Sequence, residues 1–300
     1  MIKNLASPIA SVVRSVFIVS MLVLLASAAN AQRGGSAARG GSVKPEGVKA
    51  EEPAQSQTVG IAKVSECDPA TVIGTCPGTF SLSYGFSANA SPRHGGPQTE
   101  RAGFAFAVYV TRRVFLEIDN DNVVSVKSAP NPRVTGFGDT TFYVGADAVL
   151  EGKGRPGITV LYGLKAPTAS ETKGLGSGEV DHTLLAAFGK TLGSESRSYL
   201  EFDIGDYIAR DSTTHNFDHF PFAAGIFERK LGATKKYRWH TEVGGSFATS
   251  ASNADMYTLN YLQTKLTDHV AIRTGARFGL TPNSPRAGIY LAVKFSGNLK

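Results

Sequence analysis

Apolar and polar side chains alternate through the second half of this sequence, and this alternation constrains the fold more than any other feature. It is clearest at residues 237–243, 272–280 and 289–295. Successive residues of a β-strand point to opposite faces of the sheet, so each alternating segment predicts a strand with two different faces. One face is apolar or aromatic, and the other carries Arg, His, Glu, Lys or Gly.

Twelve strands are predicted from residue 79 onward, and the connections between them alternate in length. Short turns such as 111–113, 193–196 and 267–269 alternate with mostly longer polar segments. An even number of strands, with short turns at one rim and long loops at the other, is typical of an outer-membrane barrel. The predicted strands are 79–88, 103–110, 113–127, 138–151, 157–166, 182–191, 197–210, 218–230, 236–249, 255–267, 270–282 and 286–296.

The predicted fold class is all-β. We expect residues 79–300 to form a transmembrane, antiparallel, up-and-down β-barrel of about twelve strands in the outer membrane of a Gram-negative bacterium. Closing a sheet leaves no unpaired strand edge, which is the condition for strands to lie in lipid. The alternative is a soluble β-sandwich, but such a fold has no reason to keep the alternation of short and long connections over six hairpins.

The first 31 residues have the features of a secretory signal peptide. Lys3 and Arg14 are basic, residues 16–26 are mainly apolar, and small residues precede a predicted cleavage site between Ala31 and Gln32. A retained membrane anchor is the alternative, but about 18 apolar residues are normally needed to span a bilayer and this run is shorter. Losing the leader lowers the formal charge of +6 by two, and the remaining charges are mixed in sign, which gives no argument for nucleic-acid binding.

Two further segments precede the predicted barrel. Residues 32–60 are rich in Gly, Ser, Ala, Pro, Gln and charge, so we expect a flexible periplasmic segment. Residues 61–78 contain Cys67 and Cys76, the only two cysteines. In an oxidising periplasm this pair predicts a disulfide that closes a small loop, whereas a metal or redox role is disfavoured because the spacing is not C-x-x-C.

The alternation also assigns side chains to the two faces of the predicted barrel. A charged residue facing lipid near mid-membrane costs about 2–4 kcal/mol, and almost none falls on the apolar face. Aromatic residues near strand ends, Tyr199, Tyr237, Trp239 and Phe295, predict an interfacial girdle at the periplasmic rim. The predicted outer face includes Phe104, Phe106, Val108, Val110, Phe142, Val144, Ala146, Ala148, Leu150, Ile158, Val160, Tyr162, Leu164, Leu200, Phe202 and Ile204.

The opposite face predicts a lumen lined by ionisable side chains. Acids come mainly from the third to the seventh predicted strand and bases mainly from the ninth to the twelfth, so opposite walls are expected to differ in sign. We interpret these charges as paired within the lumen in preference to forming a dedicated substrate site, because an ionisable group at membrane depth must pair or face a cavity. The predicted lumen-lining residues are Glu117, Asp119, Asp147, Lys165, Glu201, Asp203, Arg238, His240, Glu242, Arg273, Arg277 and Lys294.

Three short motifs resemble one family of outer-membrane proteins. They are Gly-Phe-Gly-Asp at 136–139, Leu-Lys-Ala-Pro-Thr at 164–168, and the Gly-rich run at 174–181. Together they resemble the outer-membrane proteins associated with phenol meta-pathway degradation, which are similar to a broader set of channels for aromatic and other hydrophobic compounds. Taken by themselves, the glycines and the proline predict turns and strand ends, and we interpret them as loop architecture rather than ligand contacts.

The predicted function is a channel, not an enzyme, that admits small molecules, aromatic or hydrophobic compounds among them, across the outer membrane. Its expected partners are outer-membrane lipid, the barrel-assembly machinery and a small-molecule permeant, with no catalytic residue, cofactor or metal. One alternative is a structural or adhesive surface barrel that acts through its loops. The other is a lipid-modifying barrel enzyme, for which His182, His215, His219 and His269 lack a recognisable Ser/His/acid spacing.

Overall fold

The computed structural model of this 300-residue chain describes residues 78–90, 98–127, 131–193, 198–210, 216–247, 255–281 and 284–298. The predicted signal peptide with its cleavage site, the flexible segment 32–60, and the cysteines Cys67 and Cys76 lie outside these residues. Within the described part, no helix is long and apolar enough to cross a membrane.

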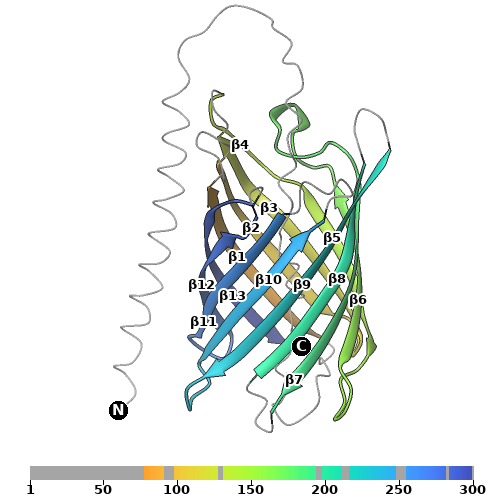
Figure 1. Cartoon of the computed structure of the whole chain (residues 1–300), viewed down its shortest axis with the longest axis vertical. Coiled ribbons are helices and arrows are strands. Elements are labelled where there is room, and N and C mark those ends of the chain that lie inside the picture. Colours follow the sequence, from red (N-terminus) through yellow and green to blue (C-terminus); the bar gives the residue numbers. More distant parts are fainter. Residues whose placement is uncertain are drawn as a thin grey trace, which may run out of the picture.

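Thirteen strands and one short 3₁₀ helix make up the described secondary structure (Figure 1). The helix η1 spans Glu171–Lys173. The strands are β1 Thr79–Ala90, β2 Gln98–Tyr109, β3 Val114–Lys127, β4 Val134–Gly136, β5 Thr140–Val149, β6 Gly157–Ala166, β7 Asp181–Leu192, β8 Ser198–Arg210, β9 Phe217–Leu231, β10 Tyr237–Ser246, β11 Asp255–Lys265, β12 Val270–Gly279 and β13 Ala287–Asn298.

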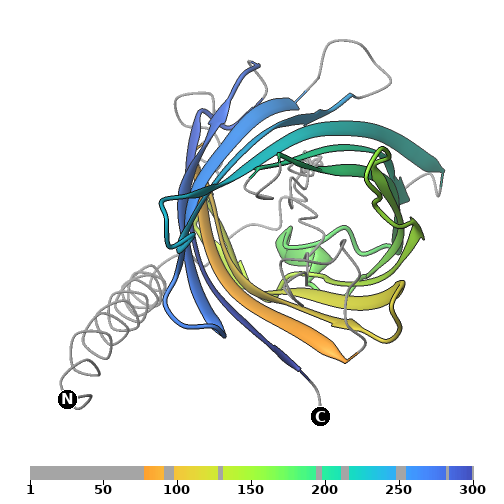
Figure 2. The same cartoon turned by 90° about the horizontal axis from the view of Figure 1, so that it is seen from below.

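These strands form one antiparallel sheet that closes on itself. Apart from β4, which pairs with β3 beside the β3–β5 pair, each strand pairs with its neighbours in the sequence. The sheet closes because β1 also pairs with β13 along its whole length, from Thr79 opposite Asn298 to Ala90 opposite Ala287. Figure 2 shows the resulting ring of strands nearly end-on. The predicted all-β, antiparallel barrel of about twelve strands is confirmed, with β4 as one short additional strand.

The additional strand β4 lies where the sequence predicted only a loop. The first half of β3, from Val114 to Asn120, pairs with β5. Near its other end, Val124–Val126 pairs with β4. The backbone comes close here because Gly138 donates its N–H to the carbonyl of Asp121 at 2.7 Å. A Cβ on Gly138 would lie 2.6 Å from that of Asp121, so this approach requires glycine. The strand predicted at 138–151 accordingly runs from Thr140 to Val149.

The two ends of the barrel differ. One end carries the start of β1, the end of β13 and the connections 110–113, 150–156, 193–197, 232–236 and 266–269. Backbone hydrogen bonds close turns at this end, for example from the N–H of Val110 to the carbonyl of Val114 and from the N–H of Leu266 to the carbonyl of Val270. The opposite end carries the longest connection, 167–180. We call this opposite end the mouth.

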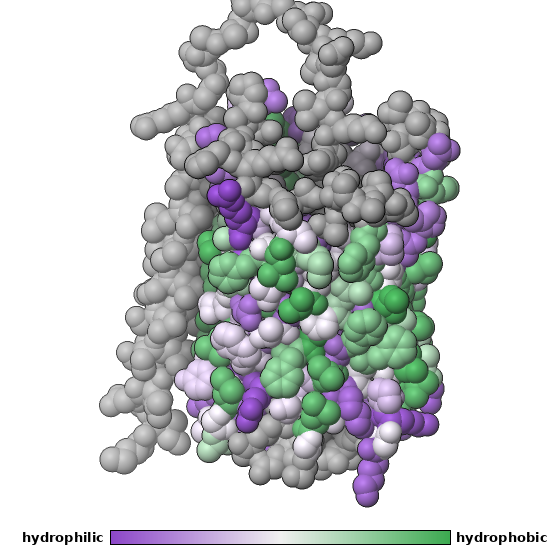
Figure 3. All heavy atoms as spheres, viewed as in Figure 1, coloured by the Kyte–Doolittle hydropathy of each residue, from purple (hydrophilic) through white to green (hydrophobic). Residues whose placement is uncertain are grey.

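The outer wall exposes apolar side chains. Apolar residues dominate the middle of the face in Figure 3, and hydrophilic ones are more frequent toward its two ends. Tyr237, Trp239 and Phe295 of the predicted girdle are exposed, but Tyr199 is not part of it, because it lies on the same face of β8 as the buried Glu201. Exposed members of the predicted outer face are Val110, Phe142, Val144, Ala148, Val160, Tyr162, Leu200, Phe202 and Ile204.

Candidate functional site

Five predicted acidic residues lie on the inner face of β3, β5 and β8. Glu117, Glu201 and Asp203 are buried, and Asp119 and Asp147 are half-buried. Hydroxyl groups satisfy two of them: Thr159 donates to Asp147 at 2.7 Å, and Tyr199 donates to Glu201 at 2.6 Å. This hydrogen bond explains why the Tyr199 side chain points inward. A buried carboxylate needs a donor, and the Tyr199 hydroxyl supplies one.

Across the barrel, β10 to β12 carry a stack of rings and charges. The His240 ring lies 4.1 Å from the Tyr261 ring with an interplanar angle of 13°, and the Arg273 guanidinium lies 5.4 Å from the same tyrosine ring. His240 also contacts Glu228 at 3.1 Å, and Arg238 contacts that same carboxylate at 3.4 Å. Planar cations stack on tyrosine rings because the ring face is electron-rich.

A second stacked pair lies nearer the mouth. The Arg277 guanidinium sits 4.0 Å from the Tyr257 ring centroid, and its Nη2 lies 3.7 Å from a carboxylate oxygen of Asp255. The hydroxyl of Tyr257 donates to the buried carboxylate of Glu242. Arg277 Nε has no hydrogen-bond partner. This guanidinium therefore retains donor capacity next to an aromatic ring.

The sequence predicts walls of opposite sign, and the structure places cations and carboxylates on both sides of the barrel. The predicted bases Arg238, Arg273 and Arg277 lie on β10 and β12, and Lys294 is half-buried on β13. That side also holds its own carboxylates on β9, β10 and β11, which contact its cations. On the acidic side, Lys165 lies between carboxylates. Each wall thus contains charges of both signs.

An apolar cluster also lines the lumen, and the sequence analysis missed it. Phe115, Tyr143, Leu161 and Leu185 are buried and pack together on β3, β5, β6 and β7. The Phe115 ring covers Gly145, where a Cβ would lie 2.0 Å from it. These residues alternate with exposed apolar neighbours, so both faces of the strands are apolar at this depth. The sequence does contain a signal for this cluster. Phe115 lies two residues before Glu117 on the same strand, so the two side chains point to the same face of the sheet.

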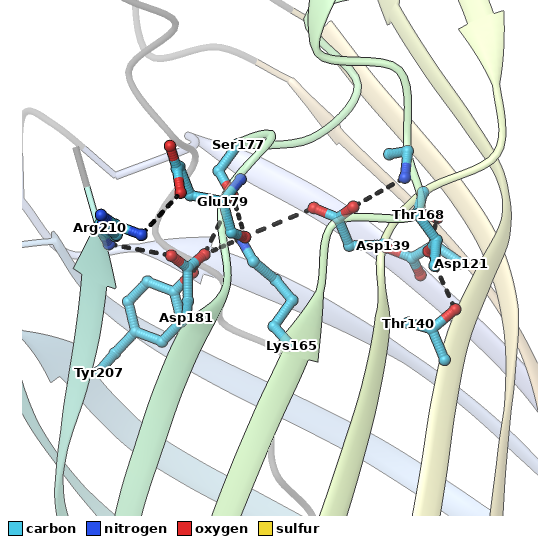
Figure 4. A network of polar contacts seen from close by, with 12 residues as sticks. Asp121, Asp139, Thr140, Lys165, Thr168, Ser177, Glu179, Asp181, Tyr207 and Arg210 are labelled. Carbon is cyan, nitrogen blue, oxygen red and sulfur yellow. Dashed lines mark hydrogen bonds and ion pairs between the residues drawn. The ribbon is translucent and has the colours of Figure 1, made fainter. Parts of the chain in front are cut away.

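The mouth contains a buried ion cluster centred on Lys165, drawn in Figure 4. The Lys165 side chain is 2% exposed, and its ammonium contacts the carboxylate of Asp181, which is fully buried, and lies 3.7 Å from that of Asp139. Asp181 begins β7, Lys165 is the last residue but one of β6, and Asp139 directly precedes β5. The cluster therefore joins three neighbouring strands where each meets the mouth.

Further donors converge on Asp181. The hydroxyl of Tyr207 donates to its Oδ2 at 2.6 Å, the hydroxyl of Ser177 donates to the same oxygen at 3.1 Å, and the N–H of Arg210 donates to Oδ1 at 3.0 Å (Figure 4). The guanidinium of Arg210 lies 3.6 Å from Glu179. A carboxylate removed from water needs such partners, because an unpaired buried charge is costly.

The connection 167–180 is bound to this cluster and to the adjoining strand. The N–H of Ala169 donates to Asp139 at 2.8 Å, and the hydroxyl of Thr168 lies 3.1 Å from that of Thr140 and donates to the carbonyl of Gly138 at 3.3 Å. All three family-like motifs thus meet here. Each motif lies at a strand end or in a connection of the mouth.

The histidines outside the lumen make local contacts. His182 lies 2.8 Å from the hydroxyl of Tyr162, His219 lies 2.6 Å from Asp206, and His269 lies 3.0 Å from the carbonyl of Ser296. His215 falls outside the described residues. Among the described residues, no group of His, Cys, Asp and Glu has the arrangement of a metal site.

Comparison with known proteins identifies the fold. No protein-family model matches the chain, and no curated protein matches it. A solved outer membrane channel from Pseudomonas putida F1 superposes with a TM-score of 0.57 at 14% identity, over 77% of this chain and 100% of that one. The KdgM porin gives 0.48 at 12% identity, over 73% and 99%, and the CymD monoaromatic hydrocarbon channel gives 0.42 at 8%, over 75% and 89%. At 14% identity the likeness to the first of these is one of fold, a closed antiparallel β-barrel.

Proposed function

We propose that this chain is an outer-membrane channel through which small molecules diffuse. The observation that carries the proposal is the division of the closed barrel into two faces. Its outer wall exposes apolar side chains, whereas Glu117, Glu201, Asp203, His240 and Glu242 are buried inside. Strands can lie in lipid only when every backbone group is paired, and ionised groups at that depth must face a cavity or a partner.

The lumen proposed for this channel is lined by the twelve ionisable residues predicted from the sequence. They are spread over β3, β5, β6, β8, β10, β12 and β13, and so surround the axis rather than forming one patch. A solute would meet carboxylates on one side and stacked Arg and Tyr side chains on the other. Rings of charged side chains are a common basis of selectivity in pores.

Aromatic or other hydrophobic compounds are the solutes that we propose. The support is the resemblance of the motifs at 136–139, 164–168 and 174–181 to the phenol meta-pathway proteins, together with the apolar cluster around Phe115 and Tyr143 inside the lumen. An apolar inner surface offers such solutes contacts that a purely charged lumen would not.

Conductance of the purified mature protein in planar lipid bilayers tests the channel, and swelling of proteoliposomes in solutions of small aromatic and aliphatic solutes tests the choice of permeant. We expect discrete conductance steps and solute-dependent swelling, with protein-free liposomes as the control. A folded, membrane-inserted barrel that carries no current and admits no solute would exclude the proposal and favour a surface protein that acts through its loops.

Export to the outer membrane also has direct tests. We propose cleavage between Ala31 and Gln32, a disulfide between Cys67 and Cys76, and insertion by the barrel-assembly machinery. N-terminal sequencing of protein from isolated outer membranes should begin at Gln32, and its mass should rise by about two hydrogens on reduction. An uncleaved N-terminus or free thiols in that protein would contradict the first two statements.

A further inference from the structure

We propose that the connection 167–180 is a fixed constriction across the mouth, and that Lys165 is the residue that holds it in place. This inference rests on the proposed channel function and specifies what sets its size limit. It concerns the positioning of the loop and not contact between Lys165 and a solute.

The loop lies over the opening rather than away from it. Seen along the barrel in Figure 2, the segment with η1 falls inside the ring of strands, and Figure 1 places the same segment at the mouth. Its Leu175 is only 8% exposed. In a loop that extended freely into solvent, this side chain would be exposed.

The Lys165 cluster holds both ends of the loop at once. Asp139 accepts the N–H of Ala169 at the start of the loop, and Asp181 accepts the hydroxyl of Ser177 near its end. The same two carboxylates are those that Lys165 contacts. Without the ammonium, two buried carboxylates would face each other uncompensated, and moving the loop aside to admit water would relieve them.

Packing holds the middle of the loop. Gly174 ends η1 with a φ of +64°, and its N–H donates to the carbonyl of Glu171. Leu175 then reaches β4, where a Cβ on Gly136 would lie 2.5 Å from Leu175 Cδ1 and meet no other atom within 4 Å. The loop is thus held by charge at its ends and by apolar contact at its centre.

The first test replaces Lys165 with methionine, which has a similar length and no charge. In planar bilayers the K165M protein should show a single-channel conductance raised by about twofold or more, and proteoliposomes should admit larger solutes than wild type. The matched control is Lys190→Met. Lys190 also contacts a carboxylate, Glu151 at 3.2 Å, and binds the connection 150–156 at the opposite end of the barrel. Its conductance should equal that of wild type.

A rescue variant separates charge from packing. In K165M combined with Asp139→Asn and Asp181→Asn, no uncompensated carboxylate remains, and each amide oxygen can still accept the N–H of Ala169 or Arg210. Conductance should return toward the wild-type value. If the triple variant conducts as much as K165M, the charge argument is wrong.

A further variant reaches the loop without altering any charge. Gly136→Val should displace Leu175, which the added Cβ would meet first, and raise conductance in the same direction as K165M. This variant keeps the proposal testable if K165M fails to fold. Heat-dependent mobility on gels confirms folding in every case. Wild-type protein without conductance would reject the channel itself. A conducting wild type with unchanged conductance in both K165M and Gly136→Val would reject the constriction alone.

Discussion

The mouth and the β10–β12 wall both place cations beside partners inside the same barrel, yet they use them differently. At the mouth, the compact ammonium of Lys165 is enclosed by carboxylates and is 2% exposed. On the opposite wall, the guanidinium groups of Arg273 and Arg277 stack on tyrosine rings. An ammonium acts as a point charge that carboxylates can surround, whereas a guanidinium is planar and matches a ring face.

The two kinds of contact have different consequences for the barrel. The enclosed charge joins strands β5, β6 and β7 to the loop 167–180, so it governs the geometry of the mouth. The stacked charges contact side chains of β11, Tyr261 and Gln263 for Arg273, and Tyr257 and Asp255 for Arg277, so they shape the inner surface of the wall. A change at the mouth should therefore cost more stability than an equivalent change on the wall.

The largest loss of stability is expected from Asp181→Ala, which removes a carboxylate from the ion cluster at the mouth. It leaves Lys165 with Asp139 at 3.7 Å and removes the carboxylate that accepts from the Tyr207 hydroxyl and the Arg210 N–H, whereas Ser177 keeps the carbonyl of Glu179. Removing one partner of a buried pair typically costs about 3–5 kcal/mol. Urea unfolding from lipid vesicles measures the loss. A loss below about 1 kcal/mol, the range of an exposed pair, would mean that water already reaches the cluster.

Tyr261→Ala should have an intermediate effect on the opposite wall. It removes the ring that stacks on His240 and lies beside Arg273, and each such contact contributes about 0.5–1.5 kcal/mol. The same unfolding measurement applies, with Tyr261→Phe as the control because it keeps the ring. If the alanine variant lost as much stability as Asp181→Ala, the distinction between the two regions would not hold.

The smallest loss of stability is expected from Arg273→Lys, which keeps the positive charge and removes the planar guanidinium group. It loses the Nε bond to Gln263 at 2.9 Å and most of the stacking, for a cost of about 0.5–1 kcal/mol. Gln263→Ala removes the acceptor alone and should cost less. Equal stability of wild type and Arg273→Lys would show that the planar group contributes nothing beyond its charge.

Much of the fold follows from local alternation. The period of two assigned Phe202 and Ile204 to the outer wall and Glu201 and Asp203 to the opposite face, and all four have the expected exposure. The same rule could have placed Tyr199 correctly, because it shares the parity of Glu201. Its position beside a turn predicts a place in the girdle instead, and the hydrogen bond of its hydroxyl to Glu201 shows that parity is the better guide here. Tyr257 and Tyr261 are buried on the inner face, which residue type alone does not predict, because a tyrosine suits either face of a barrel strand.

What the sequence by itself determined is the class of fold and the two faces of each strand, because the direction of a side chain along a strand depends only on position within that strand. The tertiary structure alone decided that Asp139, Lys165 and Asp181 meet, that the loop 167–180 turns over the mouth, and that β4 pairs with one end of β3. These contacts join residues far apart in the chain. They depend on sheet register and loop path, which no local pattern encodes.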